Sequence, residues 1–498
     1  MMKRTGIAIL AVILLIAFSG TAMAEMPATQ AKNIILMIGD GMGGWHVDAT
    51  RKYLDSGPLA MESLRYHGYM TTFMRNSTGG GTISGEYWDD GSEVGDYDPM
   101  QGGFTPWEKV PSPEYLQLGA TDSAAAASTM ADGFKCAKYT LNAVAKDDGY
   151  DDTLPYSVKY HPTIVDIAEG MGKATGLVTS VNFNHATPAG FIVKTQYRKN
   201  YGEKARQMVY SDVDVIMGGG HPYYDDNGTV RTPDFYTWGV NQGPYLDNID
   251  GEALYNQVAA GFKGRTFIDA QIDFEDLADG DGQYNGGAMP LRVFGLAQVA
   301  DTLQHDRNID DGDASDDWQV GGQAFVPNVP TLDTMTKGAL GVLEQDEDGF
   351  FLMVEGGAVD WASHAGDMTR MLEENIDFDA AVASVIEWIE DDSNGSNWNN
   401  TLLIITADHE CGHLQPAGAY IGDDVITNQC WGVGCAGWGD HTNSLVPIYA
   451  QGPGSWVLRA KYYGDYKDNT DIFTTMFTSM TGIKFWPYMG WYFPGKFK

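Results

Sequence analysis

The chain has 498 residues, 43% of them hydrophobic, and carries a formal net charge of −36 at pH 7. A chain of this length and composition can bury a large core, so disorder is not indicated. The excess of carboxylates argues against a nucleic acid or an anionic membrane as a partner, because both would repel the protein.

The first residues read as an export signal rather than as part of the fold. Lys3 and Arg4 precede the apolar stretch 7–18, and a small-residue motif, Ala-Met-Ala, ends at Ala24. These are the parts of a secretory signal peptide, which we expect to span residues 1–24. An uncleaved signal anchor is the alternative. No other segment has the length of a transmembrane helix, so we expect a mature chain without a membrane span, in the periplasm or secreted.

Three short apolar runs predict buried strands of a parallel sheet; they occupy residues 34–38, 350–354 and 402–405. Each run leads into residues of metal-binding types, namely Asp40, Glu355 and the pair Asp408-His409. Open α/β sheets bind their ligands beyond the carboxyl ends of the strands. We therefore expect these side chains to converge in one crevice.

The rest of the chain alternates helical and extended patterns. Helices are predicted at 41–50, 124–131, 161–170, 291–303, 332–344 and 371–389, and further strands at 174–181, 214–217 and 445–450. This alternation predicts an α/β fold with a mainly parallel central sheet flanked by helices on both faces. Long surface insertions are expected at about 76–113, 222–328 and 415–440. We expect residues 25–498 to form a single catalytic domain, although the length would also fit two.

One acidic stretch offers alternating oxygen ligands of the kind that bind Ca²⁺. It begins at Asp306 and continues through Asp310 to Asp313. However, Asp311 stands where the sharp-turn glycine of a calcium loop belongs, and no glutamate closes the loop. We favour a solvated acidic loop here and keep an additional Ca²⁺ as the alternative.

Two sets of candidate metal ligands follow from the residues alone. Asp360 and His364 are four positions apart, which places both on one face of a helical turn. Each set has three oxygen or nitrogen ligands and no thiolate, the pattern of zinc with an open, catalytic position. The two sets are Asp360, His364 and His441, and Asp40, Asp408 and His409.

Ser123 follows Thr121-Asp122 and opens an alanine-rich helical stretch. A helix N-terminus favours an anion, and a serine beside zinc can ionise near neutral pH and act as a nucleophile. The alternative is a serine that only caps the helix. Arg198 is a candidate bidentate clamp for two phosphoryl oxygens, with a surface arginine as its alternative.

Other histidines and cysteines are not assigned to a metal site. Cys411, two positions past His409, is not expected to bind a metal, and His46, His67, His161 and His305 are taken as ordinary core or surface residues. Cys430 and Cys435 flank a glycine-rich loop and are expected to form a disulfide in an oxidising compartment, with a free pair as the alternative.

Taken together, the motifs resemble those of the alkaline phosphatases, in the same order, between about residues 32 and 452. The matching segments are Ile35-Leu-Met-Ile-Gly-Asp40-Gly-Met-Gly, Thr121-Asp-Ser-Ala-Ala, His185-Ala-Thr187-Pro with Arg198, Val354-Glu-Gly-Gly-Ala-Val-Asp360 with His364, Thr406-Ala-Asp-His409, and His441-Thr. The resemblance implies that Ser123 forms a phosphoserine intermediate and that Arg198 clamps the phosphate. It also implies a homodimer.

The resemblance further implies two Zn²⁺ and one Mg²⁺. One zinc would be held by Asp360, His364 and His441, the second by Asp40, Asp408 and His409, and Mg²⁺ by Asp40, Thr187 and Glu355. His185 and Trp361 stand near the third site, where the best-known bacterial members have aspartate and lysine.

The expected activity is hydrolysis of small phosphate monoesters to an alcohol and inorganic phosphate. A metal enzyme acting on phosphodiesters or sulfate esters is one alternative, against which Arg198 and the Thr187/Glu355 site argue. A non-catalytic, acidic metal-binding surface protein is another. That protein would have no use for Ser123 or Arg198.

Overall fold

The structure is a computed structural model that describes residues 30–74, 120–136, 138–145, 158–195, 197–239, 250–308, 324–391, 393–415, 420–422, 424–428, 430–432, 439–459 and 466–483. The predicted signal peptide, the insertion at about 76–113 and the later residues of the candidate calcium loop lie outside these ranges. So does Cys435, and its pairing with Cys430 stays a prediction. Among the described helices, none has the length and apolar character needed to cross a membrane.

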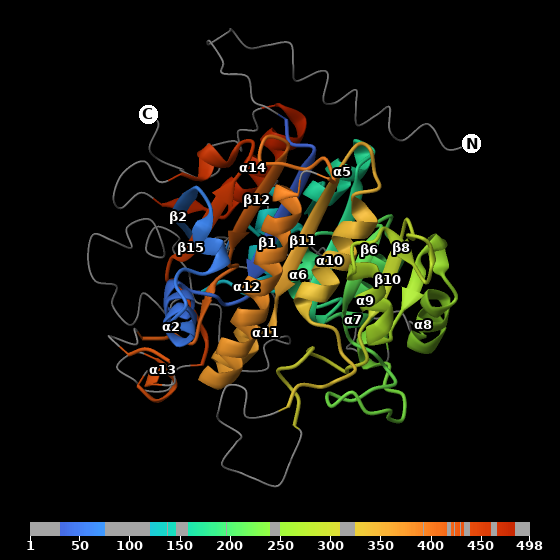
Figure 1. Ribbon diagram of the computed structural model, residues 1–498, viewed down its shortest axis with the longest axis horizontal. Coiled ribbons are helices and arrows are strands. Elements are labelled where there is room, and N and C mark those ends of the chain that lie inside the picture. The colour runs from blue at the N-terminus through green and yellow to red at the C-terminus, as the bar shows by residue number, and fades with distance from the viewer. Residues whose placement is uncertain are drawn as a thin grey trace, which may run out of the picture.

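A sheet of ten strands forms the centre of the described part (Figure 1). The order across it is β16 (Lys467–Asp468), β2 (Tyr66–Thr71), β15 (Val446–Gln451), β12 (Thr401–Thr406), β1 (Asn33–Gly39), β11 (Phe350–Gly356), β5 (Ala174–Asn182), β6 (Val215–Gly219), β10 (Val293–Leu296) and β7 (Thr266–Ile268). Only β15 runs antiparallel to its neighbours. The fold is α/β with a mainly parallel sheet, as predicted.

Helices cover both faces of this sheet (Figure 1). One layer contains α2 (Gly44–Leu54), α9 (Gln271–Ala278), α10 (Leu332–Leu343), α11 (Ala358–Ala365) and α12 (Met368–Glu390). The other contains α4 (Ser123–Asp132), α5 (Ile164–Gly170), α6 (Ala186–Gly190) and α14 (Thr470–Thr481).

Further elements complete the described part. The helices are α7 (Tyr201–Tyr210), α8 (Gly251–Ala259), α13 (Asp424–Thr427), η1 (Ala60–Ser63), η2 (Tyr236–Trp238), η3 (Phe262–Gly264) and η5 (Ser455–Leu458). Two-stranded ribbons pair β3 (Ala143–Ala145) with β4 (Val158–Tyr160), β8 (Gln283–Tyr284) with β9 (Gly287–Ala288), and β13 (Glu410–Cys411) with β14 (His441–Thr442).

The three apolar runs form the middle of the sheet. Every residue of β1, β11 and β12 is buried, as expected for strands covered on both faces. Ile38 of β1 pairs with Glu355 of β11 and with Thr406 of β12. This register brings the residues after all three strands to one edge of the sheet.

The helix predicted at 291–303 is wrong. Val293–Leu296 is instead the buried strand β10, parallel to both β6 and β7. A short apolar run cannot be assigned by periodicity alone, and here the sheet decides it. Gly295 allows close packing, since a Cβ added there would lie 2.6 Å from the Phe274 ring. The segment 222–328, predicted to be an insertion, therefore contributes two strands to the central sheet.

Candidate active site

The loop after β1 brings Asp40 against the other strand ends. The backbone N–H of Asp40 donates to the carbonyl of Gly356 (3.1 Å), and that of Gly41 donates to Oδ1 of Asp408 (3.1 Å). Gly41 has φ +71°, and a Cβ there would lie 3.0 Å from Asp360. Only glycine combines this backbone conformation with so close an approach. The expected convergence of Asp40 with Asp408 is present.

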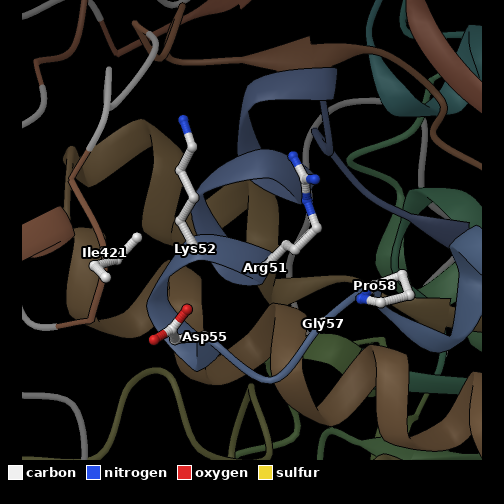
Figure 2. Close-up of a pocket in the computed structure, with 6 residues that line it drawn as sticks. All are labelled: Arg51, Lys52, Asp55, Gly57, Pro58 and Ile421. Carbon is white, nitrogen blue, oxygen red and sulfur yellow. The ribbon is translucent and has the colours of Figure 1, made fainter.

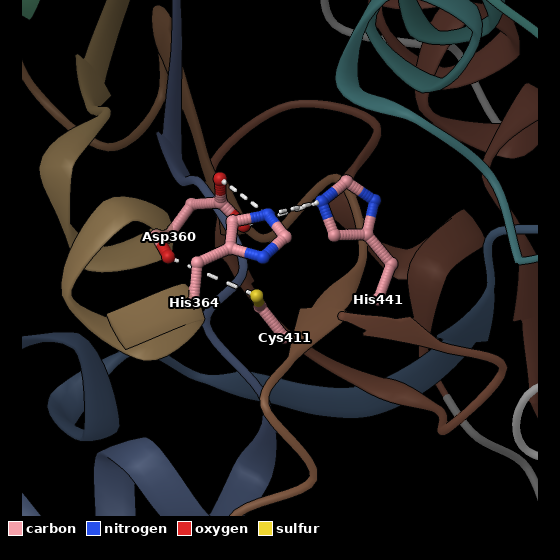
Figure 3. A group of neighbouring side chains, drawn as sticks. All are labelled: Asp360, His364, Cys411 and His441. Carbon is pink, nitrogen blue, oxygen red and sulfur yellow. Dashed lines mark hydrogen bonds and ion pairs between the residues drawn. The ribbon is translucent and has the colours of Figure 1, made fainter. Parts of the chain in front are cut away.

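A first group joins Asp360 and His364 of α11 to His441 of β14 (Figure 3). The Nε2 atoms of His364 and His441 lie 3.0 Å apart, each 3.4 Å from an Asp360 oxygen. The Nδ1 atom of His441 donates to the carbonyl of Thr121 (2.7 Å), and that of His364 donates to the carbonyl of Gly439. These bonds leave both Nε2 atoms free to face one point beside the carboxylate.

The Cys411 thiol also belongs to this first group, which the sequence did not lead us to expect. Its S–H donates to the backbone carbonyl of Asp360 (3.7 Å; Figure 3). Burial, with the nearby Asp360 carboxylate, holds the pKa of the thiol well above its usual range.

A second group joins Asp40, Asp408 and His409, all fully buried. Nε2 of His409 lies 3.1 Å from Oδ2 of Asp408, 3.4 Å from Oδ1 of Asp40 and 3.3 Å from the Ser123 hydroxyl. One imidazole nitrogen thus faces both carboxylates and the predicted nucleophile.

A third group joins Asp40, Glu355 and His185. The Thr179 hydroxyl donates to Oε2 of Glu355 (2.5 Å) and so orients that carboxylate. Thr187 lies on α6, two positions after the N-cap residue His185, and is fully buried.

Trp361 lies between two imidazoles beside this third group. Its ring centroid is 5.6 Å from that of His185 and 6.3 Å from that of His305, both in edge-on geometry. His305, taken from the sequence as an ordinary residue, therefore reaches the border of the site.

The three groups and Thr187 hold many buried polar atoms that have no hydrogen-bond partner among the described residues. They are both carboxylate oxygens of Asp40, Oδ1 of Asp360, Oδ2 of Asp408, Oε1 of Glu355, Oγ1 of Thr187, and Nδ1 of His185 and of His409. Unpaired buried groups of this kind are costly. Oxygen and imidazole donors facing common points are the ligand types of Zn²⁺ and Mg²⁺, so the residues present fit metal ions.

The carboxylates also repel one another. Burial, followed by the charges of Asp408, Asp360 and Glu355, raises the pKa of Asp40 well above its ordinary value. Burial likewise raises the pKa of Glu355 to about 7. Bound cations would remove both penalties.

Ser123 is the first residue of α4, and Asp122 caps this helix. The Asp122 carboxylate accepts from the N–H groups of Ala124 (3.3 Å) and Ala125 (3.4 Å). The alternative in which Ser123 is itself the cap is therefore wrong. Its hydroxyl is left facing His409 at the positive end of the helix.

Asp122 also holds Arg198. Nη1 of Arg198 donates to Oδ2 of Asp122 (2.8 Å), and the backbone N–H of Tyr139 donates to Oδ1 (2.8 Å). The Arg198 side chain is 16% exposed, so it is not a free surface arginine. Burial opposes its charge, but Asp122, Tyr201 and Asp40 together outweigh burial and raise the pKa of the guanidinium. Asp122 thus links the predicted nucleophile and the predicted clamp.

Lys204 on α7 is a further buried cation that the sequence did not single out. It is 1% exposed and forms no ion pair with the described residues. Its Nζ lies 3.8 Å from the centroid of the Tyr201 ring. Burial, followed by the charge of Arg198, holds the pKa of Lys204 well below its usual range. Burial, then Arg198 and Lys204, similarly lowers the pKa of His185.

Two features lie apart from these groups. Asp226, Asp301 and Asp306 form a partly buried acidic cluster, and Asp306 begins the candidate calcium loop; we assign no ion to this cluster. A surface hollow of about 350 Å³ lies at the carboxyl end of α2 (Figure 2), and its lining contains none of the predicted site residues: Arg51, Lys52, Asp55, Gly57, Pro58 and Ile421.

Comparison with known proteins identifies this arrangement. The alkaline phosphatase family model matches residues 112–433, more than half of the chain. The chain belongs to the alkaline phosphatase family. It is an enzyme of the phosphomonoesterase class, and the family depends on metal ions.

Individual relatives extend the match over most of the chain. The alkaline phosphatase of Escherichia coli strain K12 is 27% identical over 91% of this chain and 87% of its own length. Streptomycin-6-phosphate phosphatase of Streptomyces griseus is 27% identical over 94% of each chain.

Solved structures of similar fold include alkaline phosphatases from two bacteria. That of the Antarctic bacterium TAB5 has a TM-score of 0.56 at 22% identity and covers 91% of this chain and 98% of its own. That of Thermus thermophilus has a TM-score of 0.59 at 19% identity, with coverages of 92% and 93%. These likenesses support the fold.

Proposed function

We propose that this family member is an exported phosphomonoesterase that works through a phosphoserine at Ser123. The observation that carries the proposal is the position of the Ser123 hydroxyl. It lies 3.3 Å from an imidazole of the second ligand group, and Ser123 directly follows Asp122, the residue that binds Arg198. A phosphoryl group beside this hydroxyl would meet cations on both sides.

The ligand groups support the assignment of two Zn²⁺ and one Mg²⁺. The first zinc would be held by Asp360, His364 and His441, the second by Asp40, Asp408 and His409, and Mg²⁺ by Asp40, Thr187 and Glu355. A histidine-to-aspartate mutant of the TAB5 enzyme has Mg bound in a site called M3. Here His185 belongs to the third group, so His185 would lie beside the Mg²⁺.

When bound, the metal ions would neutralise the clustered carboxylates, favour the ionised serine and stabilise charge on the attacking and leaving oxygens.

The protein's own groups would bind and orient the phosphate. Arg198 can donate to two phosphoryl oxygens while it is kept in place by Asp122, because a guanidinium has five N–H donors. The N-terminus of α4 adds a positive dipole end at Ser123. These contacts would orient the phosphate beside Oγ of Ser123.

The reaction would proceed in two displacements. In the first, Oγ of Ser123 gives its proton to solvent and bonds to phosphorus, while the ester P–O bond breaks and the leaving oxygen takes a proton as the alcohol. In the second, water bonds to phosphorus as the Oγ–P bond breaks. Oγ regains a proton, and inorganic phosphate leaves.

The remaining features of the proposal come from the sequence and the family. The chain would be processed after residue 24, would act in the periplasm or outside the cell, and would form one catalytic domain over 25–498 and a homodimer. Size-exclusion chromatography with light scattering of the mature chain tests the last point.

Trapping of the intermediate tests the mechanism directly. A labelled phosphate monoester is mixed with the enzyme, quenched in acid and mapped by mass spectrometry. We expect the label on Ser123, and we expect Ser123→Ala to lose the label and about 10⁴-fold or more of turnover while it keeps its metals. Label on another residue would refute the assignment.

A panel of substrates tests the activity itself. We expect chromogenic phosphate monoesters to be hydrolysed far faster than the matching phosphodiester or sulfate ester. A preference for either of those two esters would favour the corresponding alternative enzyme, and hydrolysis of none of the three would leave only metal binding.

A further inference from the structure

His46 is a buried histidine of α2 that belongs to none of the three ligand groups. Both of its ring nitrogens are used. The backbone N–H of Gly43 donates to Nδ1 (3.1 Å), so the proton must be on Nε2, which donates to the Ser363 hydroxyl (3.1 Å). The ring is therefore a neutral, single tautomer, and burial lowers its pKa to about 4.

The Ser363 hydroxyl has a second bond that fixes its direction. It donates to the backbone carbonyl of Val359, one turn earlier in α11 (2.7 Å). Because the hydroxyl proton is already used, Ser363 can only accept from His46. His46 and Ser363 thus form a chain of hydrogen bonds from Gly43 to α11, in which the direction of every bond is fixed.

This chain joins the two parts of the metal centre. Gly43 lies three residues after Asp40, in the loop that begins at the end of β1. Ser363 lies on α11 between Asp360 and His364. His46 therefore spans the gap between the segment that bears Asp40 and the helix that bears two ligands of the first group.

Further contacts fix the position of His46. Thr50 donates to its backbone carbonyl (2.9 Å), and Asn375 of α12 donates to the Thr50 hydroxyl (2.7 Å). The Trp431 ring packs against the imidazole, with centroids 5.7 Å apart. The imidazole is thus fixed by Gly43, Ser363 and Trp431. A fixed ring can hold α11 at a defined distance from the loop after β1, which a mobile side chain could not.

We propose that His46 is a positioning residue of the metal centre. It holds α11 at a set distance from the Asp40 loop, so that Asp360 and His364 meet His441 around one ion. The inference rests on the proposed assignment of a zinc to these three ligands. It goes beyond that assignment by giving a role to a residue that touches neither ion nor substrate.

A purely structural role predicts a different behaviour. A core histidine that only fills space would affect the free energy of unfolding and leave metal affinity unchanged. Partners that orient metal ligands typically contribute ten- to a hundredfold in affinity. The zinc affinity of the first group, measured on the apo-protein, therefore separates the two roles without using activity.

The experiment titrates metal-free protein with Zn²⁺ against a chromophoric chelator, with His364→Ala as the reference that identifies the first group. We expect Ser363→Ala and His46→Leu each to weaken that site by at least about tenfold, and the double variant to be no weaker than the worse single. His46→Gln keeps a donor for Ser363 and should retain most of the affinity.

The control is Thr336→Val in α10, which removes a buried hydroxyl that also donates one turn back, to Leu332 (2.7 Å). It should lower the melting temperature of the apo-protein with no change in zinc affinity. If Ser363→Ala and His46→Leu behave like this control, the inference is overturned. If His46→Leu does not fold, Ser363→Ala and His46→Gln still decide it. Absence of zinc binding by the wild type would instead overturn the proposed function, and this inference with it.

Discussion

The two sides of the candidate site differ in how completely their buried polar groups are paired. The ligand side consists of the three ligand groups, and among the described residues its carboxylates and imidazoles retain unpaired atoms. The clamp side consists of Asp122, Ser123 and Arg198, where Asp122 pairs with both the helix N-terminus and the guanidinium. Cations would therefore stabilise the ligand side, whereas the contacts of the clamp side are made by the protein alone.

Removal of the metals should disrupt the arrangement of the ligand side and leave the clamp side unchanged. We expect a chelator to reduce activity to background, because no protein group can replace the missing cations, and Zn²⁺ with Mg²⁺ to restore it. The melting temperature should also fall, since an ion at a hundred times its Kd contributes about 2.7 kcal/mol. Activity assays and calorimetry, before and after the metals are added back, measure the activity and the melting temperature. Full activity in a preparation shown to be metal-free contradicts the mechanism.

Arg198→Lys should damage the clamp side while it leaves the ligand side intact. The variant keeps the charge, but an ammonium lacks the planar fork with which a guanidinium can bond two phosphoryl oxygens while it is paired with Asp122. We expect kcat/KM to fall about 10- to 100-fold, the range for a lost charged hydrogen bond, with unchanged metal content.

The matched control for the clamp is Arg206→Lys, an exposed arginine of α7 paired with Glu203. Its kinetics should equal those of the wild type. If Arg198→Lys does so too, Arg198 has no part in phosphate binding.

Trp361→Lys tests the boundary between the two sides. The indole, between His185 and His305, supplies no charge near the third ligand group. A lysine there would attract the product, so we expect about tenfold tighter competitive inhibition by inorganic phosphate, and slower turnover wherever release is limiting. Trp361→Phe should leave inhibition near the wild-type value. Weaker or unaltered inhibition in the lysine variant would reject this account.

Lys204→Met should have the smallest effect, on stability rather than on turnover. The folded-state pKa of Lys204 is held below the unfolded value of about 10.4. Between these two pKa values the unfolded chain binds more protons, so wild-type stability rises with pH. We expect the variant to be more stable by about 1–3 kcal/mol at neutral pH, with the gain vanishing above about pH 10.4.

Urea unfolding at several pH values measures this gain. Lys337→Met, an exposed lysine of α10, is the control and should show no pH-dependent gain. A gain for Lys204→Met that is constant with pH would show that the lysine is charged in both states.

The sequence predicted the ligand side better than the clamp side. The ends of β1, β11 and β12 could be located because each apolar run is followed at once by a ligand type. The hydrogen bond between Arg198 and Asp122 could not be predicted, because it joins residues 76 positions apart through tertiary packing.

Buried polar residues on helices were also beyond prediction. Lys204 and His46 occur in helices with polar neighbours, where such residues are normally solvated, and no local pattern reveals their burial. The same limit explains the error at Val293–Leu296, where pairing with distant strands decided between helix and strand.

The central position of β1 bears on the order in which the molecule folds. It is the first strand of the described residues, yet its neighbours in the sheet are β11 and β12, and the Gly41 N–H donates to Asp408 across 367 positions. Contacts of such sequence separation form late, after the intervening chain has been closed into loops. With the proposed ligands, a newly made chain would bind metal ions only once its last third has joined β1, and metal content would then report completed folding.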